Sequence, residues 1–134
     1  MKTKFNLLLL AGLCFITAVS AQTQKSEMLT GSWKVQSLTA KFPPNVTVKQ
    51  KTKGEKTIAD DETEFKKAGF LFTGNKLTVG KKKFTWVMDK DGSQVVVKKG
   101  KKVIITAKLL ELSAHQLIFT RPDEGMIVTY TLAR

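Results

Sequence analysis

The feature that most constrains this chain is an alternation of apolar and polar side chains. From residue 69 onward the sequence is a series of short alternating runs, separated by turn residues such as those at 89–93. Alternation with a period of two places one face of a strand on a core and the other in solvent, so each run predicts a β-strand. With an earlier run, the predicted strands are residues 32–39, 69–73, 76–80, 83–89, 94–98, 103–110, 115–121 and 126–134.

The connections between these strands predict their arrangement. From residue 69 each strand leads to the next through a short turn, and Gly74-Asn75 is typical of a two-residue hairpin. Strands linked by hairpins form an up-and-down antiparallel sheet, and a sheet of this length removes its exposed edges by closing on itself. The sequence therefore predicts an all-β fold, an eight-stranded up-and-down antiparallel β-barrel whose last strand pairs with its first.

The first connection, residues 40–68, differs from the others in length and composition. Pro43-Pro44 excludes a central strand, and a lysine-rich stretch follows. Residues 58–68 predict a short helix, with acidic residues in the first turn, lysines in the last turn and Gly69 as the C-cap. Its apolar stripe is thin, so we expect this helix to lie on the surface of the barrel.

The first 21 residues have the composition of an export signal. Lys2 and Lys4 precede an apolar run, and residues 19–21 resemble a signal-peptidase site. We therefore expect a signal peptide at residues 1–21, an N-terminal linker at residues 22–28 and one barrel domain at residues 29–134, in an exported protein that is periplasmic or secreted. Cys14 leaves a lipoprotein open as an alternative, although Leu13 stands where a lipidation motif has a small residue.

The chain after residue 21 contains no cysteine, so no disulfide supports the fold and core burial must stabilise it. No stretch after residue 21 is long and apolar enough to be a transmembrane helix. The formal net charge of the whole chain is +12, which favours acidic or anionic partners.

The stretch Gly31-Ser32-Trp33, at the start of the first predicted strand, resembles the Gly-x-Trp signature of lipocalins. With the strand count, the long first connection and the export signal, it makes the chain similar to short bacterial lipocalin-like domain proteins. The resemblance implies structural roles for Gly31 and Trp33, and an arginine across the tryptophan at one end of the barrel. Arg134 is the candidate, because an antiparallel last strand ends beside the start of the first, and its contact would be of the cation–π type. The disulfide and C-terminal helix of larger lipocalins are missing.

Side chains that could carry catalysis are few. His115 is the one histidine of the chain, and neither a Gly-x-Ser-x-Gly motif nor a phosphate-binding glycine loop occurs. The histidines and cysteines are too few for a zinc site built from several such ligands. We therefore expect a protein that is not an enzyme, with no catalytic residue, no metal site and no cofactor.

Two groups of residues are candidates for binding. The interior candidates are bulky residues in the inward phase of the strands, which either fill the barrel or line a pocket for one small ligand: Phe84, Trp86, Met88, Phe119 and Tyr130. The second group forms a basic rim, because alternate connections of an up-and-down barrel emerge at the same end. This basic rim consists of Lys81, Lys82, Lys83, Lys98, Lys99, Lys101 and Lys102.

These candidates support two hypotheses. The first is a non-enzymatic, lipocalin-like binding protein of the cell envelope that takes a small apolar or amphipathic ligand with an anionic group. The alternative is a filled barrel, an interaction module whose basic rim faces anionic lipid, polysaccharide or an acidic protein. Export and the number of strands argue against a nucleic-acid partner. The sequence leaves open the identity of the ligand, the state of the interior and the oligomeric state.

Overall fold

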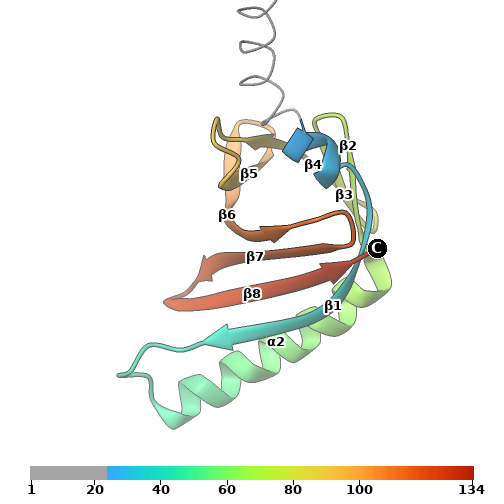
Figure 1. Cartoon of the computed structure of the whole chain (residues 1–134). Coiled ribbons are helices and arrows are strands. Elements are labelled where there is room, and N and C mark those ends of the chain that lie inside the picture. Colours follow the sequence, from blue (N-terminus) through green and yellow to red (C-terminus); the bar gives the residue numbers. More distant parts are fainter. Residues whose placement is uncertain (1–23) are drawn as a thin grey trace, which may run out of the picture.

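A closed barrel of eight antiparallel strands, paired in chain order, forms the body of the protein (Figure 1). The computed structural model describes residues 24–134. The strands are β1 Gly31–Lys41, β2 Phe70–Thr73, β3 Lys76–Val79, β4 Lys82–Met88, β5 Gln94–Lys99, β6 Lys102–Leu112, β7 Gln116–Asp123 and β8 Met126–Ala133. The predicted all-β, up-and-down barrel is confirmed. The expected signal peptide at residues 1–21 lies outside the described residues.

Alternating side chains build the core of this barrel. In β8, Met126, Val128, Tyr130 and Leu132 are buried, and the residues between them are more exposed. β8 is paired along its length with β7 and with most of β1. Because an antiparallel pair shares its two faces, the inward residues of these three strands meet in one continuous apolar layer.

β1 divides its pairing between its two neighbours. Gly31, Ser32 and Trp33 pair with β2, and the remainder of the strand, Lys34–Lys41, pairs with β8. A bulge between Val35 and Ser37 marks an irregularity in the β8 ladder. Beyond Trp33, therefore, no strand among the described residues 24–134 pairs with the β2-side edge of β1.

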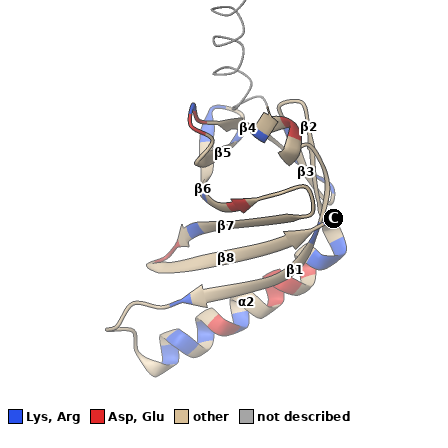
Figure 2. Ribbon diagram, viewed as in Figure 1, with Lys and Arg blue, Asp and Glu red and all other residues tan. Residues whose placement is uncertain are grey.

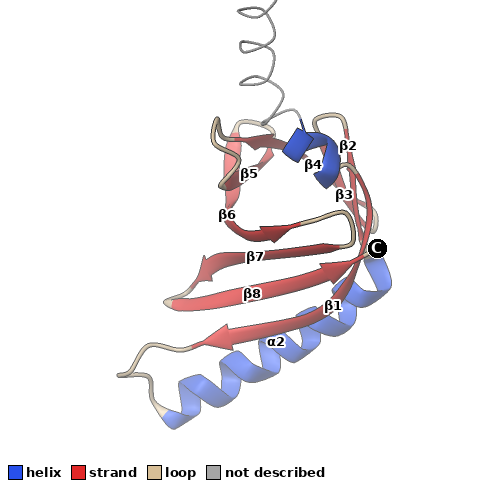
Figure 3. Ribbon diagram, in the orientation of Figure 1, coloured by secondary structure: helices blue, strands red, loops and turns tan. Residues whose placement is uncertain are grey.

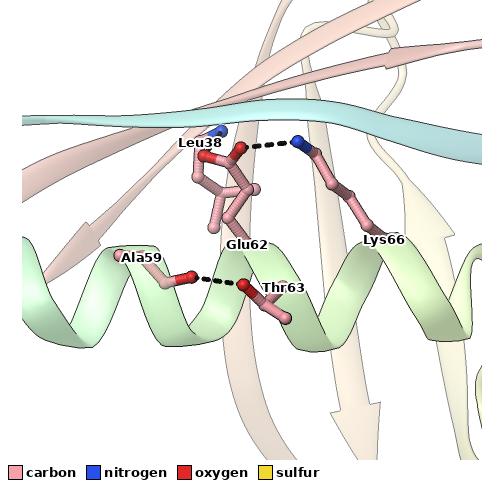
Figure 4. Close-up of polar contacts among 5 residues, drawn as sticks. All are labelled: Leu38, Ala59, Glu62, Thr63 and Lys66. Atoms are coloured by element: carbon pink, nitrogen blue, oxygen red, sulfur yellow. Dashed lines mark hydrogen bonds and ion pairs between the residues drawn. The ribbon is translucent and has the colours of Figure 1, made fainter.

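The helix α2 (Val48–Ala68) lies along β1 and packs on it (Figure 3). The Leu38 backbone N–H donates to Glu62 Oε2 at 3.2 Å, and Glu62 Oε1 lies 2.8 Å from Lys66 Nζ (Figure 4). Two side chains of the helix face the barrel: Ile58 is buried, and Phe65 packs against the core. A side chain of the helix thus occupies a backbone donor that a neighbouring strand would otherwise use, which is one way that proteins cover a sheet edge.

The helix is much longer than predicted, which corrects the expected bounds of residues 58–68. It begins after Thr47, whose Oγ1 accepts from the Gln50 N–H at 3.1 Å, while Gln50 Oε1 accepts from the Thr47 N–H at 3.0 Å. This is a capping box. The first turn contains no acidic residue, so the acids assigned to it lie further along the helix. Figure 2 shows them in the C-terminal half of α2, with lysines at its end.

Residues 24–29, most of which fall in the stretch 22–28 expected as an N-terminal linker, are helical. Leu29 is fully buried, Ser26 Oγ contacts Met88 Sδ at 3.8 Å, and Lys25 Nζ donates to the Asp91 carbonyl at 3.0 Å. These contacts place the helical residues against β4 and the turn that follows it. They form part of the barrel domain and cover one of its ends. Within residues 24–134, no helix has the length and apolar character required to cross a bilayer.

Candidate ligand-binding site

The end of the barrel covered by residues 24–29 is closed by a tryptophan and an arginine. Trp33 is fully buried, and its Nε1 donates to the Leu29 carbonyl at 2.8 Å. The guanidinium of Arg134 lies over the indole ring, as the resemblance implied, with Cζ 4.1 Å from the ring centroid. Its N–H groups donate to the carbonyls of Thr30 at 2.6 Å, Ala114 at 2.9 Å and Met28. Arg134 therefore joins the end of β8 to residues 28–30 and to the turn between β6 and β7 at this closed end.

A largely apolar cavity of about 400 Å³ occupies the barrel between this closed end and the β3–β4 turn. Its volume lies within the range typical of small-molecule sites. Residues of β2 to β8 line it, and the C-terminal part of α2 adds Glu64, Phe65 and Ala68. The interior is therefore not completely filled by side chains, a question that the sequence left open. One wall of the cavity comes from the helix, which the sequence did not indicate.

The five interior candidates separate into two groups. Phe84, Phe119 and Tyr130 line the cavity. Trp86 and Met88 are buried but are not among the lining residues. Trp86 instead packs edge-to-face on Phe72, with centroids 5.5 Å apart, and Met88 contacts Ser26 near the closed end. These two side chains are thus part of the packed core next to the cavity.

Aromatic rings form much of the wall beside α2. Phe119 and Tyr130 stack with centroids 4.6 Å apart and an interplanar angle of 12°. Phe65 of α2 meets Phe70 edge-to-face at 5.6 Å and lies 5.9 Å from the Tyr130 ring. Packed aromatic pairs of this kind hold fixed geometries. The helix is thereby joined to the barrel through the same rings that line the cavity.

Arg121 is a charged residue that lines the cavity next to these rings. Its Nε donates to Tyr130 Oη at 2.7 Å, and its Cζ lies 5.5 Å from the Tyr130 centroid. Its Nη2 lies 3.6 Å from Asp123 Oδ2, which is a long ion pair. A guanidinium has five N–H groups, so this arrangement leaves donors for a further acceptor. Burial raises the pKa of Tyr130, and its phenol therefore keeps the proton that it can donate.

Lysines extend this positive charge around the mouth of the cavity, by which we mean the end of the barrel opposite Trp33 and Arg134, where the β3–β4 and β5–β6 turns lie. Lys82 is two residues from Phe84, and Lys99 is two residues from Val97; both Phe84 and Val97 line the cavity. Alternation places each lysine in the inward phase of its strand, at the end nearest the mouth. Lys102 is paired with Lys99 and shares its face. The inward rows of β4, β5 and β6 thus end in Lys82, Lys99 and Lys102, whereas in β7 the inward Arg121 is followed by Asp123, which is paired with the buried Met126.

The remaining residues of the basic rim are divided between two positions. Lys81 lines the cavity with Lys82, and Lys101 lies in the β5–β6 turn. Lys83 and Lys98 alternate with the inward positions and face outward, where Lys98 is paired with Thr85. Within residues 24–134, the ion pairs are Lys66–Glu62 and Arg121–Asp123, and neither involves the basic rim.

Carboxylates lie on the α2 side of the mouth. Glu64 lines the cavity. Burial raises the pKa of Asp61, while the positive charge of Arg121 opposes this effect. The mouth is therefore uneven in charge: cations alone end the inward rows of β4 to β6, whereas acids and Arg121 balance one another near α2.

No group of histidine, cysteine and carboxylate side chains within residues 24–134 is arranged to hold a metal ion. His115 lies at the closed end, away from the cavity, with Nδ1 3.3 Å from the Arg134 carbonyl oxygen. Comparison of the chain with family models, with curated proteins and with solved structures gave no match. The function is therefore inferred from the geometry of the cavity and its mouth.

Proposed function

We propose that this chain is a non-enzymatic, lipocalin-like binding protein that takes one small amphipathic ligand with an anionic group. The observation that carries the proposal is the cavity of about 400 Å³, whose lining is largely apolar and has four charged residues, Glu64, Lys81, Lys82 and Arg121. An apolar body would be removed from water by the aromatic and aliphatic walls. The anionic group would lie among Arg121, Lys81 and Lys82. The predicted signal peptide at residues 1–21 supports the cell envelope or its surroundings as the place of action.

The size of the cavity sets the size of the ligand. If each non-hydrogen atom takes up about 30 Å³, as a water molecule does in the liquid, the cavity holds roughly a dozen such atoms. An alkyl chain with a terminal carboxylate is therefore a suitable probe. A ligand with several fused rings and a long chain would exceed the space, unless α2 moved outward.

The charged side chains favour an anion. Arg121 has unused N–H donors, and the Tyr130 hydroxyl accepts from Arg121 Nε while its own proton remains available. A carboxylate reaching them would form charge-assisted hydrogen bonds, which are stronger than neutral ones. The apolar surroundings reduce screening by water and strengthen this attraction further.

Titration with dodecanoate and with dodecanol tests the proposal. We expect dodecanoate to bind about tenfold tighter or more, since the alcohol has the same chain without the charge. The variant Ala107→Phe places a ring in the cavity, because Ala107 lines it, and should abolish the binding of both probes. The matched control is Thr106→Phe, which adds the same ring at an exposed neighbouring position. Equal affinity for the two probes would contradict an anionic site, and binding that survives Ala107→Phe would contradict an interior one.

The alternative is an interaction module that displays the basic rim to anionic lipid, polysaccharide or an acidic protein. The absence of ion pairs from the seven rim lysines within residues 24–134 supports it, because their charge is not neutralised there. The two functions separate under Ala107→Phe, which fills the cavity and leaves the rim unchanged. Partner binding that persists in this variant, without any binding of dodecanoate to the unaltered protein, would favour the interaction module.

A further inference from the structure

The mouth of the cavity combines exposed cations with exposed apolar side chains, and we propose that it docks on an anionic lipid bilayer, from which the ligand enters the cavity. This inference rests on the proposed binding function and adds the partner that delivers or receives the ligand. The relevant surface is the outer side of the β3–β4 and β5–β6 turns. We call it the docking face, and it consists of Lys83, Lys98, Lys101 and Val103.

Strand register brings the two turns together. Thr85 of β4 is paired with Lys98 of β5, so the residues that precede Thr85 and those that follow Lys98 leave the sheet at the same end. Lys98 is in turn paired with Val103 of β6. Directly paired residues of an antiparallel ladder share a face. Lys98 and Val103 are thus neighbours on the outer surface. Lys83 lies two residues from Thr85 along β4, and therefore on the same face.

Apolar side chains lie among these lysines. Val103 is 49% exposed and Ile104 is 39% exposed. A bulge separates the pairs Val97–Ile105 and Lys98–Val103, so Ile104 is an extra residue in β6, and it also lines the cavity. The exposed apolar surface of the docking face therefore continues into the interior. A ligand leaving a bilayer at this point would pass from lipid to Ile104 without crossing open water.

The combination favours a bilayer over other acidic partners. Cations near a membrane surface are attracted by anionic lipid, and apolar side chains beside them insert at the interface. An acidic polysaccharide would use the lysines and gain nothing from Val103. The opposite end of the barrel is closed by Trp33 and Arg134, so a ligand cannot pass through it.

Sedimentation with vesicles tests the proposal on the full chain. Vesicles of phosphatidylcholine mixed with phosphatidylglycerol should retain the protein, those of phosphatidylcholine alone should not, and added salt should weaken retention. The triple variant Lys83→Gln, Lys98→Gln and Lys101→Gln should lower partitioning about tenfold or more. The matched triple, Lys76→Gln, Lys90→Gln and Lys108→Gln, removes the same charge from exposed positions elsewhere and should have a much smaller effect.

The apolar part has its own pair of variants. Val103→Ser should weaken retention, and Val87→Ser, which alters a valine of β4 that is slightly more exposed, should not. Equal effects of the two triple variants would overturn the docking face. The docking face would also be overturned if the protein bound acidic polysaccharide but not vesicles, and if Val103→Ser left that binding unchanged. That result would identify a different partner.

The outcomes for docking and for ligand binding are distinguishable. If the protein binds dodecanoate from solution but ignores anionic vesicles, docking is wrong and the cavity function stands. If Ala107→Phe and the unaltered protein are retained equally on vesicles and neither binds dodecanoate, the cavity function is wrong and docking stands.

Discussion

The Arg134 guanidinium fills the space that a side chain at residue 31 would need. A β-carbon built on Gly31 would lie 2.8 Å from Arg134 Nη1, and Gly31 has a φ of 128°, which residues with side chains rarely adopt. Two residues later, Trp33 provides the ring over which the same guanidinium lies. The Gly-Ser-Trp stretch thus has a physical basis: the glycine admits the arginine and the tryptophan binds it.

Replacing Gly31 by alanine should destabilise the fold. We expect a loss of about 1–3 kcal/mol in the free energy of unfolding, from backbone strain and from displacement of Arg134. Gly100→Ala is the matched control, because Gly100 also has a positive φ, of 64°, but has no heavy atom within 4 Å of the added β-carbon. Urea denaturation measures both. A loss for Gly31→Ala no larger than that for Gly100→Ala would mean that Arg134 moves away without cost.

Trp33→Ala should be far more damaging. It removes a fully buried indole, its hydrogen bond to Leu29 and its contact with Arg134. Large-to-small changes of this kind cost about 3–5 kcal/mol, which in a domain of this size can prevent folding. Trp33→Phe keeps most of the ring and should cost less, so it remains measurable by chemical denaturation. A loss below about 1 kcal/mol for the alanine variant would contradict the anchoring role.

Trp86→Phe should be tolerated. Trp86 Nε1 is buried and has no hydrogen-bond partner within residues 24–134. Burying such a donor costs about 1–3 kcal/mol, so removing it offsets part of the packing lost with the smaller ring. The expected change in unfolding free energy is within about 1 kcal/mol. A much larger loss would indicate that the indole N–H of Trp86 has a bound partner. Trp33→Phe supplies the comparison, because the indole N–H that it removes is hydrogen-bonded to the Leu29 carbonyl.

The link between α2 and β1 should depend on pH. Hydrogen bonds from Lys66 and from the Leu38 N–H lower the pKa of Glu62. A depressed carboxyl pKa contributes stability that is present above the ordinary value, about 4.3, and lost as the pH falls through the lower folded-state value. Glu62→Ala should therefore destabilise the protein at neutral pH, by about 1 kcal/mol, and the difference should shrink in acid.

The acidic residue Glu55 provides the control for this experiment. It is exposed on the same helix, so Glu55→Ala should change stability little at either pH. Denaturant unfolding at neutral pH and near pH 3 measures both variants. A deficit for Glu62→Ala that is equally large in acid would mean that the carboxylate charge has no part in holding the helix.

Arg121 should determine the preference of the cavity for an anion. Loss of hydrogen bonds to a charged group costs about 1.5–3 kcal/mol, so Arg121→Gln should weaken dodecanoate binding roughly 10- to 100-fold and leave dodecanol binding nearly unchanged. Arg121→Lys keeps the charge but loses the planar guanidinium that reaches both Tyr130 and the ligand. Its affinity for dodecanoate should therefore lie between that of the unaltered protein and that of Arg121→Gln. Isothermal titration measures these affinities. Equal weakening of both probes would assign Arg121 to packing alone.

The barrel could be predicted because its information is local. Each hairpin is specified by alternation and by its turn residues, and closure follows from the need to cover sheet edges. The N-terminal half of α2 was missed because its lysine-rich sequence shows no apolar stripe. The signal that could have found it is Thr47 followed three residues later by Gln50, the capping box.

The cavity was harder to predict, for a different reason. Phe84, Phe119 and Tyr130 were identified by their inward phase, but the same phase also selected Trp86 and Met88, which pack into the core. Whether inward side chains touch or leave a space depends on barrel width and on α2, and neither is encoded locally. A bulge also changes the phase within β6, so the consecutive residues Ile104 and Ile105 both line the cavity, which strict alternation would not predict.

Three residue pairs join β1 to β2, whereas seven join β1 to β8. The barrel is therefore closed most weakly at one seam, and the helix that covers this seam is held by one side-chain bond to the backbone of β1 and by packing. Separating the seam breaks few hydrogen bonds and leaves the other ladders intact, so local opening there requires less free energy than unfolding of the domain. We therefore expect the wall beside α2 to exchange its backbone amides with solvent earlier than the wall formed by β7 and β8.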